Sequence, residues 1–231
     1  MGARSETVTV ADTLRRIEQI GIVPVVRAGS LEEARRAVDA IHAGGIPIIE
    51  ITMTVPDAPA MIREIVQQYG EKVLTGAGTV VNAAQAEMCL DAGAEFLVSP
   101  GLSVPVLRAA AARGKLAIPG VLTPSEIMRA LEEGINLLKI FPCGSVGGAK
   151  YLKSLRGPFP DCSFIPTGGV SLNNAAEYIS AGAFALGVGA ELVDLAALRR
   201  NDSKKIADAA KALMEAVRDA RKQRAEESKF S

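Results

Sequence analysis

The chain of 231 residues is long enough for one large α/β domain or two small ones, and 48% of its residues are hydrophobic, which is ample for a sizeable core. Basic and acidic residues number 26 each, so the formal net charge is zero, and neither nucleic acid nor an anionic membrane is indicated as a partner. Three cysteines argue against a disulfide framework, and a single histidine argues against a metal centre. No apolar run is long enough to span a bilayer, so a soluble, cytoplasmic protein is expected.

Short β-rich runs alternate with amphipathic helical patterns almost to the end of the chain. A helix is expected over Val10–Ile20, ahead of the first strand, and a charged helix over roughly Ser203–Glu227 at the end. The expected strands are Ile22–Ala28, Pro47–Met53, Val73–Val80, Glu95–Pro100, Leu116–Val121, Asn136–Pro142, Ser163–Thr167 and Phe184–Val188. The helical stretches between them include Leu31–Ala43, Ala58–Tyr69, Ala83–Ala92, Val104–Arg113 and Ser125–Glu133.

Eight βα units in one chain are the number that a closed (β/α)₈ TIM barrel requires. We therefore predict a single (β/α)₈ barrel domain over residues 1–231, with an extra N-terminal helix. An open doubly wound sheet is the alternative, but the chain has no linker and no dinucleotide fingerprint, since the glycines of Gly76-Ala77-Gly78 lie within a strand end rather than at a helix start.

Lys139 lies in a stretch, Asn136–Pro142, that otherwise reads as a buried strand. Burying an ammonium is costly, so such a lysine must be paired, or neutral and reactive. A neutral amine in a dry pocket attacks ketones and forms a Schiff base. The alternative is a lysine that reaches the strand end and pairs with a carboxylate there.

Glu50 is equally out of place in the apolar strand Pro47–Met53. Strands two and six lie opposite each other in an eight-stranded barrel, so Glu50 and Lys139 can converge on one small molecule. They are either an internal salt bridge or an amine nucleophile with a carboxylate acid/base. Thr54 shares a strand face with Glu50, and Phe141 shares one with Lys139, so both are expected in the same pocket.

Two further groups of residues follow strand ends on the same side of the barrel. Arg27 and Thr79 end strands one and three, where a guanidinium and a hydroxyl suit a substrate carboxylate. The glycines of Thr167-Gly168-Gly169 and Gly187-Val188-Gly189-Ala190 end strands seven and eight, where such barrels often bind a phosphate on backbone N–H groups. Gly144–Lys150, after strand six, is expected to be a mobile loop.

From about Ile22 to Val193 the motifs together resemble the 2-keto-3-deoxy-6-phosphogluconate (KDPG) aldolase family, which also includes 4-hydroxy-2-oxoglutarate (KHG) aldolases. The motifs are Glu50-Ile51-Thr52, Gly76-Ala77-Gly78-Thr79-Val80, Ser99-Pro100-Gly101, Ile118-Pro119-Gly120, Lys139-Ile140-Phe141-Pro142, Gly157-Pro158-Phe159 and Pro166-Thr167-Gly168-Gly169.

The resemblance implies a homotrimer of barrels and a class I aldolase that needs neither metal nor cofactor. It implies that Lys139 is the Schiff-base lysine and Glu50 the acid/base. It also implies that Thr79 and Pro100 line the pyruvate pocket, and that the phosphate is bound around Gly168, Gly169 and Gly189.

The chain departs from the family pattern at two positions. Well-known members carry an arginine four residues after the glutamate, where this chain has Thr54, so Arg27 is expected to bind the carboxylate instead. Some members end strand eight with a serine, where this chain has Ala190, so the phosphate would depend on backbone N–H groups.

The resemblance implies reversible cleavage of KDPG to pyruvate and glyceraldehyde 3-phosphate. The nearest alternatives are the same chemistry on 4-hydroxy-2-oxoglutarate or on the galactonate epimer. A metal-dependent epimerase and a non-catalytic barrel that binds a phosphorylated metabolite are the alternatives of other classes.

Overall fold

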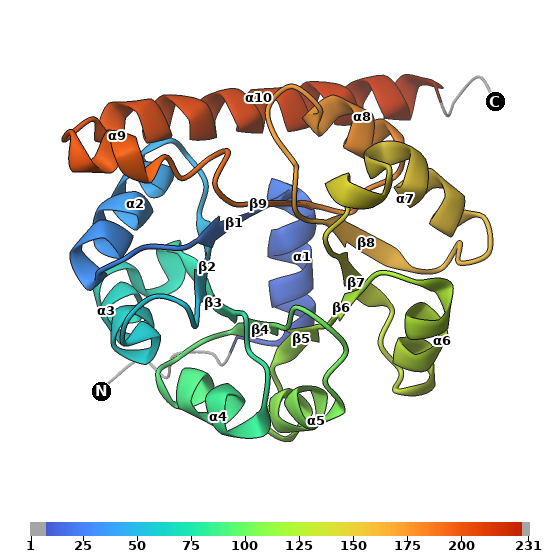
Figure 1. Cartoon of the computed structure of the whole chain (residues 1–231), viewed down its shortest axis with the longest axis horizontal. Coiled ribbons are helices and arrows are strands. Elements are labelled where there is room, and N and C mark those ends of the chain that lie inside the picture. Colours follow the sequence, from blue (N-terminus) through green and yellow to red (C-terminus); the bar gives the residue numbers. More distant parts are fainter. Residues whose placement is uncertain (1–7, 228–231) are drawn as a thin grey trace, which may run out of the picture.

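The computed structural model describes residues 8–227 as an α/β fold, in which parallel strands curve around a common centre and helices cover their outside (Figure 1). The strands are β1 (Ile22–Val26), β2 (Ile48–Thr52), β3 (Leu74–Gly78), β4 (Phe96–Val98), β5 (Leu116–Ile118), β6 (Gly120–Val121), β7 (Leu137–Ile140), β8 (Ser163–Pro166) and β9 (Leu186–Val188). The helices are α1 (Val10–Ile20), α2 (Leu31–Ala43), α3 (Ala58–Tyr69), η1 (Gly70–Lys72), α4 (Ala83–Asp91), α5 (Val104–Ala112), α6 (Pro124–Glu132), η2 (Gly144–Val146), α7 (Gly148–Arg156), α8 (Ala175–Ser180), α9 (Leu195–Arg199) and α10 (Ser203–Glu227).

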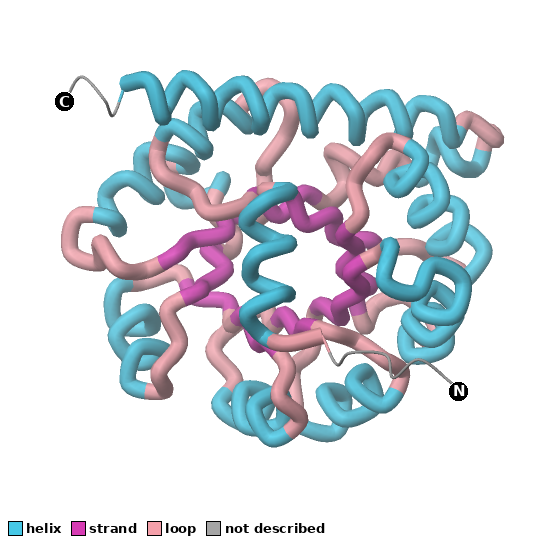
Figure 2. The backbone as a smooth tube through the Cα atoms, turned by 180° about the vertical axis from the view of Figure 1, so that it is seen from behind, coloured by secondary structure: helices cyan, strands magenta, loops and turns pink. Residues whose placement is uncertain are grey.

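All the strand pairs are parallel and fall into two sheets. A six-stranded sheet has the order β5-β4-β3-β2-β1-β9, and a three-stranded sheet has the order β6-β7-β8. An isolated parallel bridge between Thr167 and Gly187 connects the end of β8 to β9. The result is a strongly curled parallel sheet, and Figure 2 shows α1 lying across one end of it.

The predicted fifth strand, Leu116–Val121, is divided into β5 and β6 at Pro119. Proline has no N–H to donate to a ladder, so the pairing breaks there. The Pro119 carbonyl still accepts a hydrogen bond of 2.9 Å from the Lys139 N–H. Pro119 therefore separates β5 from β6, and the hydrogen bond to its carbonyl keeps β7 beside this break.

The strands are buried along almost their whole length, because helices cover the outside of the sheet and side chains fill its inside. Helix starts follow the expected capping chemistry. Thr9 and Thr123 form capping boxes with Asp12 and Glu126, and each satisfies N–H groups at the start of a helix. The predicted helices over Val10–Ile20 and Ser203–Glu227 are confirmed.

The segment Gly144–Lys150, predicted as a loop, is instead helical for most of its length. It forms η2 and then enters α7 at Gly148. Gly147 and Gly148 have φ values of 115° and 60°, a region that favours glycine, so they turn the chain between the two helices. The short helix α9 also has no counterpart in the sequence analysis. Within residues 8–227, no helix is both long and apolar enough to cross a membrane.

Candidate active site

Lys139 lies on β7, with Gly120 of β6 on one side and Ile165 of β8 on the other. Only 4% of this residue is exposed. Its Nζ lies 5.2 Å from the ring centroid of Phe141, which is half-buried two residues further on. The amine is thus held against a ring face in a largely dry environment, beside the carboxyl end of the strand.

Glu50 lies on β2 and is 2% exposed. Its Oε1 is fully buried and has no hydrogen-bond partner among the described residues. Burial raises the pKa of Glu50, and the positive charges of Lys139 and Arg27 oppose that shift. Glu50 therefore interacts electrostatically with both basic groups, and its carboxyl has the raised pKa that suits a proton carrier.

Gly78 of β3 supports the Glu50 carboxyl and was not assigned a role in the sequence analysis. A Cβ at Gly78 would lie 1.8 Å from Glu50 Oε1, so the carboxyl occupies the space that a side chain would need. Gly78 pairs with Thr52 in the register of β2 with β3. Two glycines at alternate positions of a strand beside a buried acid are the sequence signal that could have revealed this contact.

Arg27 follows β1 and shares a face with Val25, which lies opposite Glu50 in the register. The Arg27 side chain is exposed and lines a cavity of about 620 Å³ together with Ala190 and Lys205. Arg27 is therefore related to Glu50 by the strand register and by its charge, whereas the cavity that its side chain lines includes neither Glu50 nor Lys139.

The threonines at the ends of β2 and β3 differ in their surroundings. Thr79 is half-buried and has a φ of 58°, which is unusual for a β-branched residue. Thr54 is exposed, and its hydroxyl lies 2.6 Å from the hydroxyl of Thr52. Thr52 is fully buried and donates to the Val26 carbonyl, so it ties the end of β2 to β1. Thr52 shares a strand face with Glu50, although no site role was predicted for it.

Pro100 lies near Lys139 through Gly120, which separates the two residues. It is half-buried after β4, and a Cβ at Gly120 would lie 2.3 Å from the Pro100 carbonyl oxygen. Gly120 is the β6 neighbour of Lys139, so Pro100, Gly120 and Lys139 lie next to one another across the break between the two sheets.

The two glycine clusters end neighbouring strands. Gly168 and Gly169 follow β8 with φ values of 87° and 78°, and the Gly144 N–H donates to the Gly168 carbonyl. Gly189 follows β9, and its carbonyl accepts hydrogen bonds from Leu192 and Val193. The exposed Ala190 lines the same cavity as Arg27.

Metal ligands and a cysteine nucleophile are the other functional groups to consider. In the part of the chain that the structure describes, no group of three or more His, Cys, Asp or Glu side chains is arranged to hold a metal ion. Cys143 is fully buried, and burial raises the pKa of its thiol to about 11. A thiol of that kind is a poor nucleophile.

Comparison with known proteins identifies the family. The family model for KDPG and KHG aldolases matches residues 13–209. The KHG/KDPG aldolase of Escherichia coli strain K12 is 36% identical over 197 residues, which cover 85% of this chain and 92% of that protein. The 2-dehydro-3-deoxy-phosphogluconate aldolase of Dickeya dadantii strain 3937 is 38% identical over 185 residues, which cover 80% of this chain and 86% of that protein.

Among solved structures, the KDPG aldolase from Legionella pneumophila superposes with a TM-score of 0.81 and 32% identity, covering 87% of this chain and 97% of that one. That crystal structure holds pyruvate captured at low pH as a covalent carbinolamine intermediate. A family match over most of the chain, with relatives at 36% and 38% identity, shows that this chain belongs to the KDPG and KHG aldolase family and is an aldolase, a carbon–carbon lyase.

Proposed function

We propose that this chain is a class I aldolase that reversibly cleaves 2-dehydro-3-deoxy-6-phosphogluconate to pyruvate and D-glyceraldehyde 3-phosphate. The observation that carries the proposal is the burial of one lysine and one glutamate, Lys139 and Glu50, on strands of different sheets and within electrostatic range of each other. The relative that holds pyruvate as a carbinolamine supports the same chemistry here.

In the proposed reaction, the neutral amine of Lys139 attacks the C2 ketone to form a carbinolamine. Glu50 in its acid form donates a proton to the departing hydroxyl, so the carbinolamine loses water and becomes an iminium. Glu50 takes the proton of the C4 hydroxyl, directly or through one water. The C3–C4 bond then breaks, its electron pair passes to the iminium to form an enamine, and the aldehyde leaves. Glu50 returns the proton to C3. Water then hydrolyses the new iminium, which frees pyruvate and the neutral amine and gives the released proton back to Glu50.

Arg27 and Thr79 bind the substrate carboxylate and turn C2 toward the amine, which is a positioning effect. Pro100, Phe141 and Thr54 line the pyruvate pocket. Gly168, Gly169, Gly189 and Ala190 present backbone N–H groups to the phosphate. Arg27 and Ala190 line one cavity together with Glu191 and Asp194, and Lys205 there is paired with Asp194, so Arg27 is the cation of this cavity that would bind an anionic end of the substrate.

The finer architecture belongs to the same proposal. Residues 1–231 form one domain, and β5 and β6 count as one strand of a closed (β/α)₈ barrel. The bridge between Thr167 and Gly187 supports closure on one side, and the position of Pro100 against Gly120 supports it on the other. The cysteines Cys89, Cys143 and Cys162 are free and buried, which supports a reducing, cytoplasmic location.

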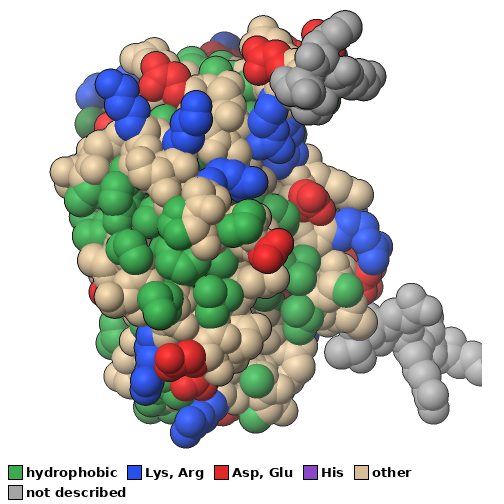
Figure 3. Space-filling view, turned by 90° about the vertical axis from the view of Figure 1, so that its right-hand side faces the viewer, with side chains coloured by type: hydrophobic (Ala, Val, Ile, Leu, Met, Phe, Trp, Pro, Cys, Tyr) green, Lys and Arg blue, Asp and Glu red, His purple; other side chains and the backbone are tan. Residues whose placement is uncertain are grey.

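We also propose a homotrimer. Hydrophobic side chains gather on the face that carries α6 and α7, with charged side chains above and below them (Figure 3). Met128 and Leu131 on α6 are 58% and 40% exposed. Large exposed apolar surfaces of this kind are typical of protein contacts.

4-Hydroxy-2-oxoglutarate is the second candidate substrate. The relative from Escherichia coli carries the name KHG/KDPG aldolase, which covers both substrates. Thr54 and Ala190 stand where the family pattern has an arginine and a serine, and the loss of the serine side chain favours a weaker requirement for phosphate.

A coupled lactate dehydrogenase assay of pyruvate release tests the proposal. The panel consists of KDPG, its galactonate epimer and 4-hydroxy-2-oxoglutarate, each with and without a chelator. We expect KDPG to give the highest kcat/KM and the chelator to have no effect. Replacing Lys139 by methionine keeps the apolar stem but removes the nucleophile, and should lower kcat/KM by about 10³-fold or more.

Lys72→Met is the matched control, because Lys72 is an exposed lysine of η1 at the amino end of β3. It should retain full activity. Near-normal turnover by the folded Lys139→Met variant, or activity that is lost with the chelator, would contradict the mechanism.

A further inference from the structure

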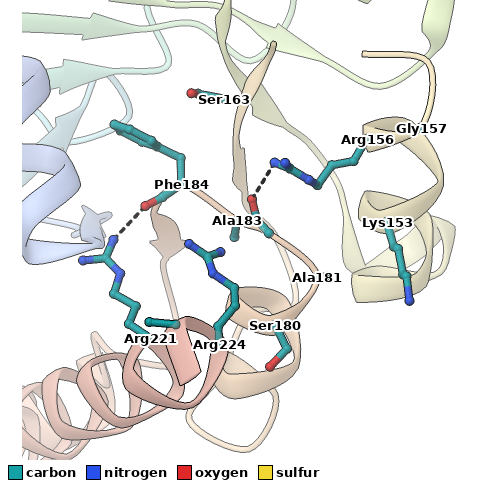
Figure 4. Close-up of a pocket in the computed structure, with 12 residues that line it drawn as sticks. Lys153, Arg156, Gly157, Ser163, Ser180, Ala181, Ala183, Phe184, Arg221 and Arg224 are labelled. Carbon is teal, nitrogen blue, oxygen red and sulfur yellow. Dashed lines mark hydrogen bonds between the residues drawn. The ribbon is translucent and has the colours of Figure 1, made fainter. Parts of the chain in front are cut away.

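A second cavity lies at the end of the fold opposite the candidate active site. Its volume is about 840 Å³, which is within the range of small-molecule sites. Ser163, the first residue of β8, lines it, whereas the candidate catalytic residues lie toward the carboxyl ends of the strands. Its walls are the carboxyl ends of α7 and α8 and the last turns of α10 (Figure 4).

The charged side chains that line this cavity in the described part of the chain are all positive. They are Lys153 and Arg156 of α7 and Arg221 and Arg224 of α10, and no acidic residue of 8–227 lines it. Among residues 8–227, none of these four side chains forms an ion pair with a carboxylate. Four cations from two helices therefore face one space, and none has a carboxylate of residues 8–227 within ion-pair distance.

The guanidinium groups are held in place by backbone carbonyls. Arg156 donates to Gly182, Arg224 donates to Ile179, and Arg221 donates to Phe184 and Gln19, at 2.8–3.1 Å. The first of these bonds and the bond from Arg221 to Phe184 are drawn in Figure 4. Arginines fixed in this way lose little conformational freedom when a ligand arrives.

The hydrogen bonds to these carbonyls use only part of the donor capacity of the three guanidinium groups and offset only part of their positive charge. A guanidinium has five N–H donors, and the carbonyls take one from Arg156, one from Arg224 and two from Arg221. The carboxyl end of a helix carries only about half a negative charge, against a full positive charge on each arginine. The pKa of Arg221 is lowered mainly by burial and also by the charge of Arg224, with Glu18 opposing, so the two arginines repel each other where they now stand.

We propose that this cavity is a second anion site, which binds a small polyanion carrying a phosphate or diphosphate group through Arg156, Arg221 and Arg224. The planar forks of arginine suit phosphate oxygens. Lys153 lies at the rim, and in Figure 4 its ammonium is directed away from Arg156, so it contributes long-range attraction more than a direct bond. Binding there is independent of the aldolase chemistry, since none of these residues belongs to the proposed catalytic machinery.

Titration calorimetry of the full chain with sodium pyrophosphate at low ionic strength tests the proposal. We expect saturable binding that weakens as sodium chloride is added, because the site is partly exposed and is screened by salt. Arg224→Gln should weaken the affinity about fivefold or more, and Lys153→Gln by a smaller factor. Lys222→Gln is the control, because Lys222 is an exposed lysine of α10 that does not line this cavity.

Two results would overturn the proposal. One is the absence of saturable heat from the wild-type chain. The other is unchanged affinity in both Lys153→Gln and Arg224→Gln, which would place the anion at the catalytic end instead. Lys153 is exposed, and its side chain forms no ion pair with residues 8–227, so Lys153→Gln should fold normally and keeps the test decisive even where Arg224→Gln fails to fold.

Discussion

At the scale of single residues, the most unusual group is the Glu50 carboxyl. Its Oε1 is buried and without a hydrogen-bond partner among the described residues, and burial raises its pKa despite two opposing positive charges. A group placed for stability alone would be satisfied by hydrogen bonds. An unsatisfied carboxyl beside a buried lysine is instead what proton transfer at a substrate requires, and it costs the fold stability.

Glu50→Gln should therefore stabilise the folded chain at neutral pH. The unfolded carboxyl titrates near 4.5, and the folded one titrates higher, so the folded chain binds the proton more tightly. The free energy of unfolding accordingly falls as the pH rises from the pKa of the unfolded Glu50 carboxyl to that of the folded one, and it stays lower at higher pH. Glutamine does not ionise, so it avoids the cost of burying a carboxylate. A change of about 1 kcal/mol in the free energy of unfolding shifts Tm by roughly 2–4 °C in a chain of this size.

Thermal unfolding at pH 4 and pH 8 measures this difference. The Gln variant should have the higher Tm at pH 8, and the gap should shrink at pH 4, while aldolase activity falls at both values. Glu95→Gln serves as a control, because Glu95 forms an ion pair with Lys115 and its loss should not stabilise the chain. A Gln variant that is less stable than the wild type at pH 8 would be inconsistent with a costly carboxyl.

At the scale of elements, the pairing of β2 with β3 decides where the Glu50 carboxyl can lie. The two strands pair over their full length, and the missing side chain of Gly78 leaves the space that Oε1 fills. Gly78→Ala should displace the carboxyl and lower kcat about 10²-fold, since a misplacement of about 1 Å is that costly.

Gly29→Ala is the matched control for this glycine. Gly29 lies in the loop between β1 and α2, its φ is outside the left-handed region, and a Cβ there would meet only the end of the flexible Glu33 side chain, at 3.4 Å. Steady-state kinetics on KDPG should show normal turnover for this variant. Wild-type kcat in a folded Gly78→Ala variant would mean that the carboxyl position does not limit the reaction.

The sequence was sufficient to predict where the strands lie, apart from the break at Pro119, and to identify the two buried ionisable side chains. A lysine and a glutamate within apolar runs are visible without coordinates, and so are helix caps such as Thr123. The contact of Gly78 with Glu50 was not predictable, because it depends on the register between two strands and on one rotamer. The helical segment after β7 was also missed, since a glycine-rich stretch reads as a loop when the packing that supports α7 is unknown.

At the scale of the whole molecule, the exposed apolar face over α6 and α7 predicts self-association. Met128→Glu would place a charge within this face, and burying an unpaired charge is unfavourable. Sedimentation equilibrium should show trimers for the wild type and mainly monomers for this variant. Lys211→Glu, which changes the charge of the exposed side of α10, should remain trimeric.

A monomeric wild-type chain would contradict the trimer and leave the exposed apolar face without a partner. A trimer that survives Met128→Glu unchanged would show that the contacts lie on another face. Neither outcome affects the chemistry proposed for Lys139, which can be examined separately.

Trapping of the Schiff base tests the central claim most directly. The chain is treated with pyruvate and borohydride, digested, and mapped by mass spectrometry. The account predicts a reduced pyruvyl adduct on Lys139, absent without pyruvate and absent from Lys139→Met. An adduct confined to another lysine, or an active protein that forms none, would contradict it.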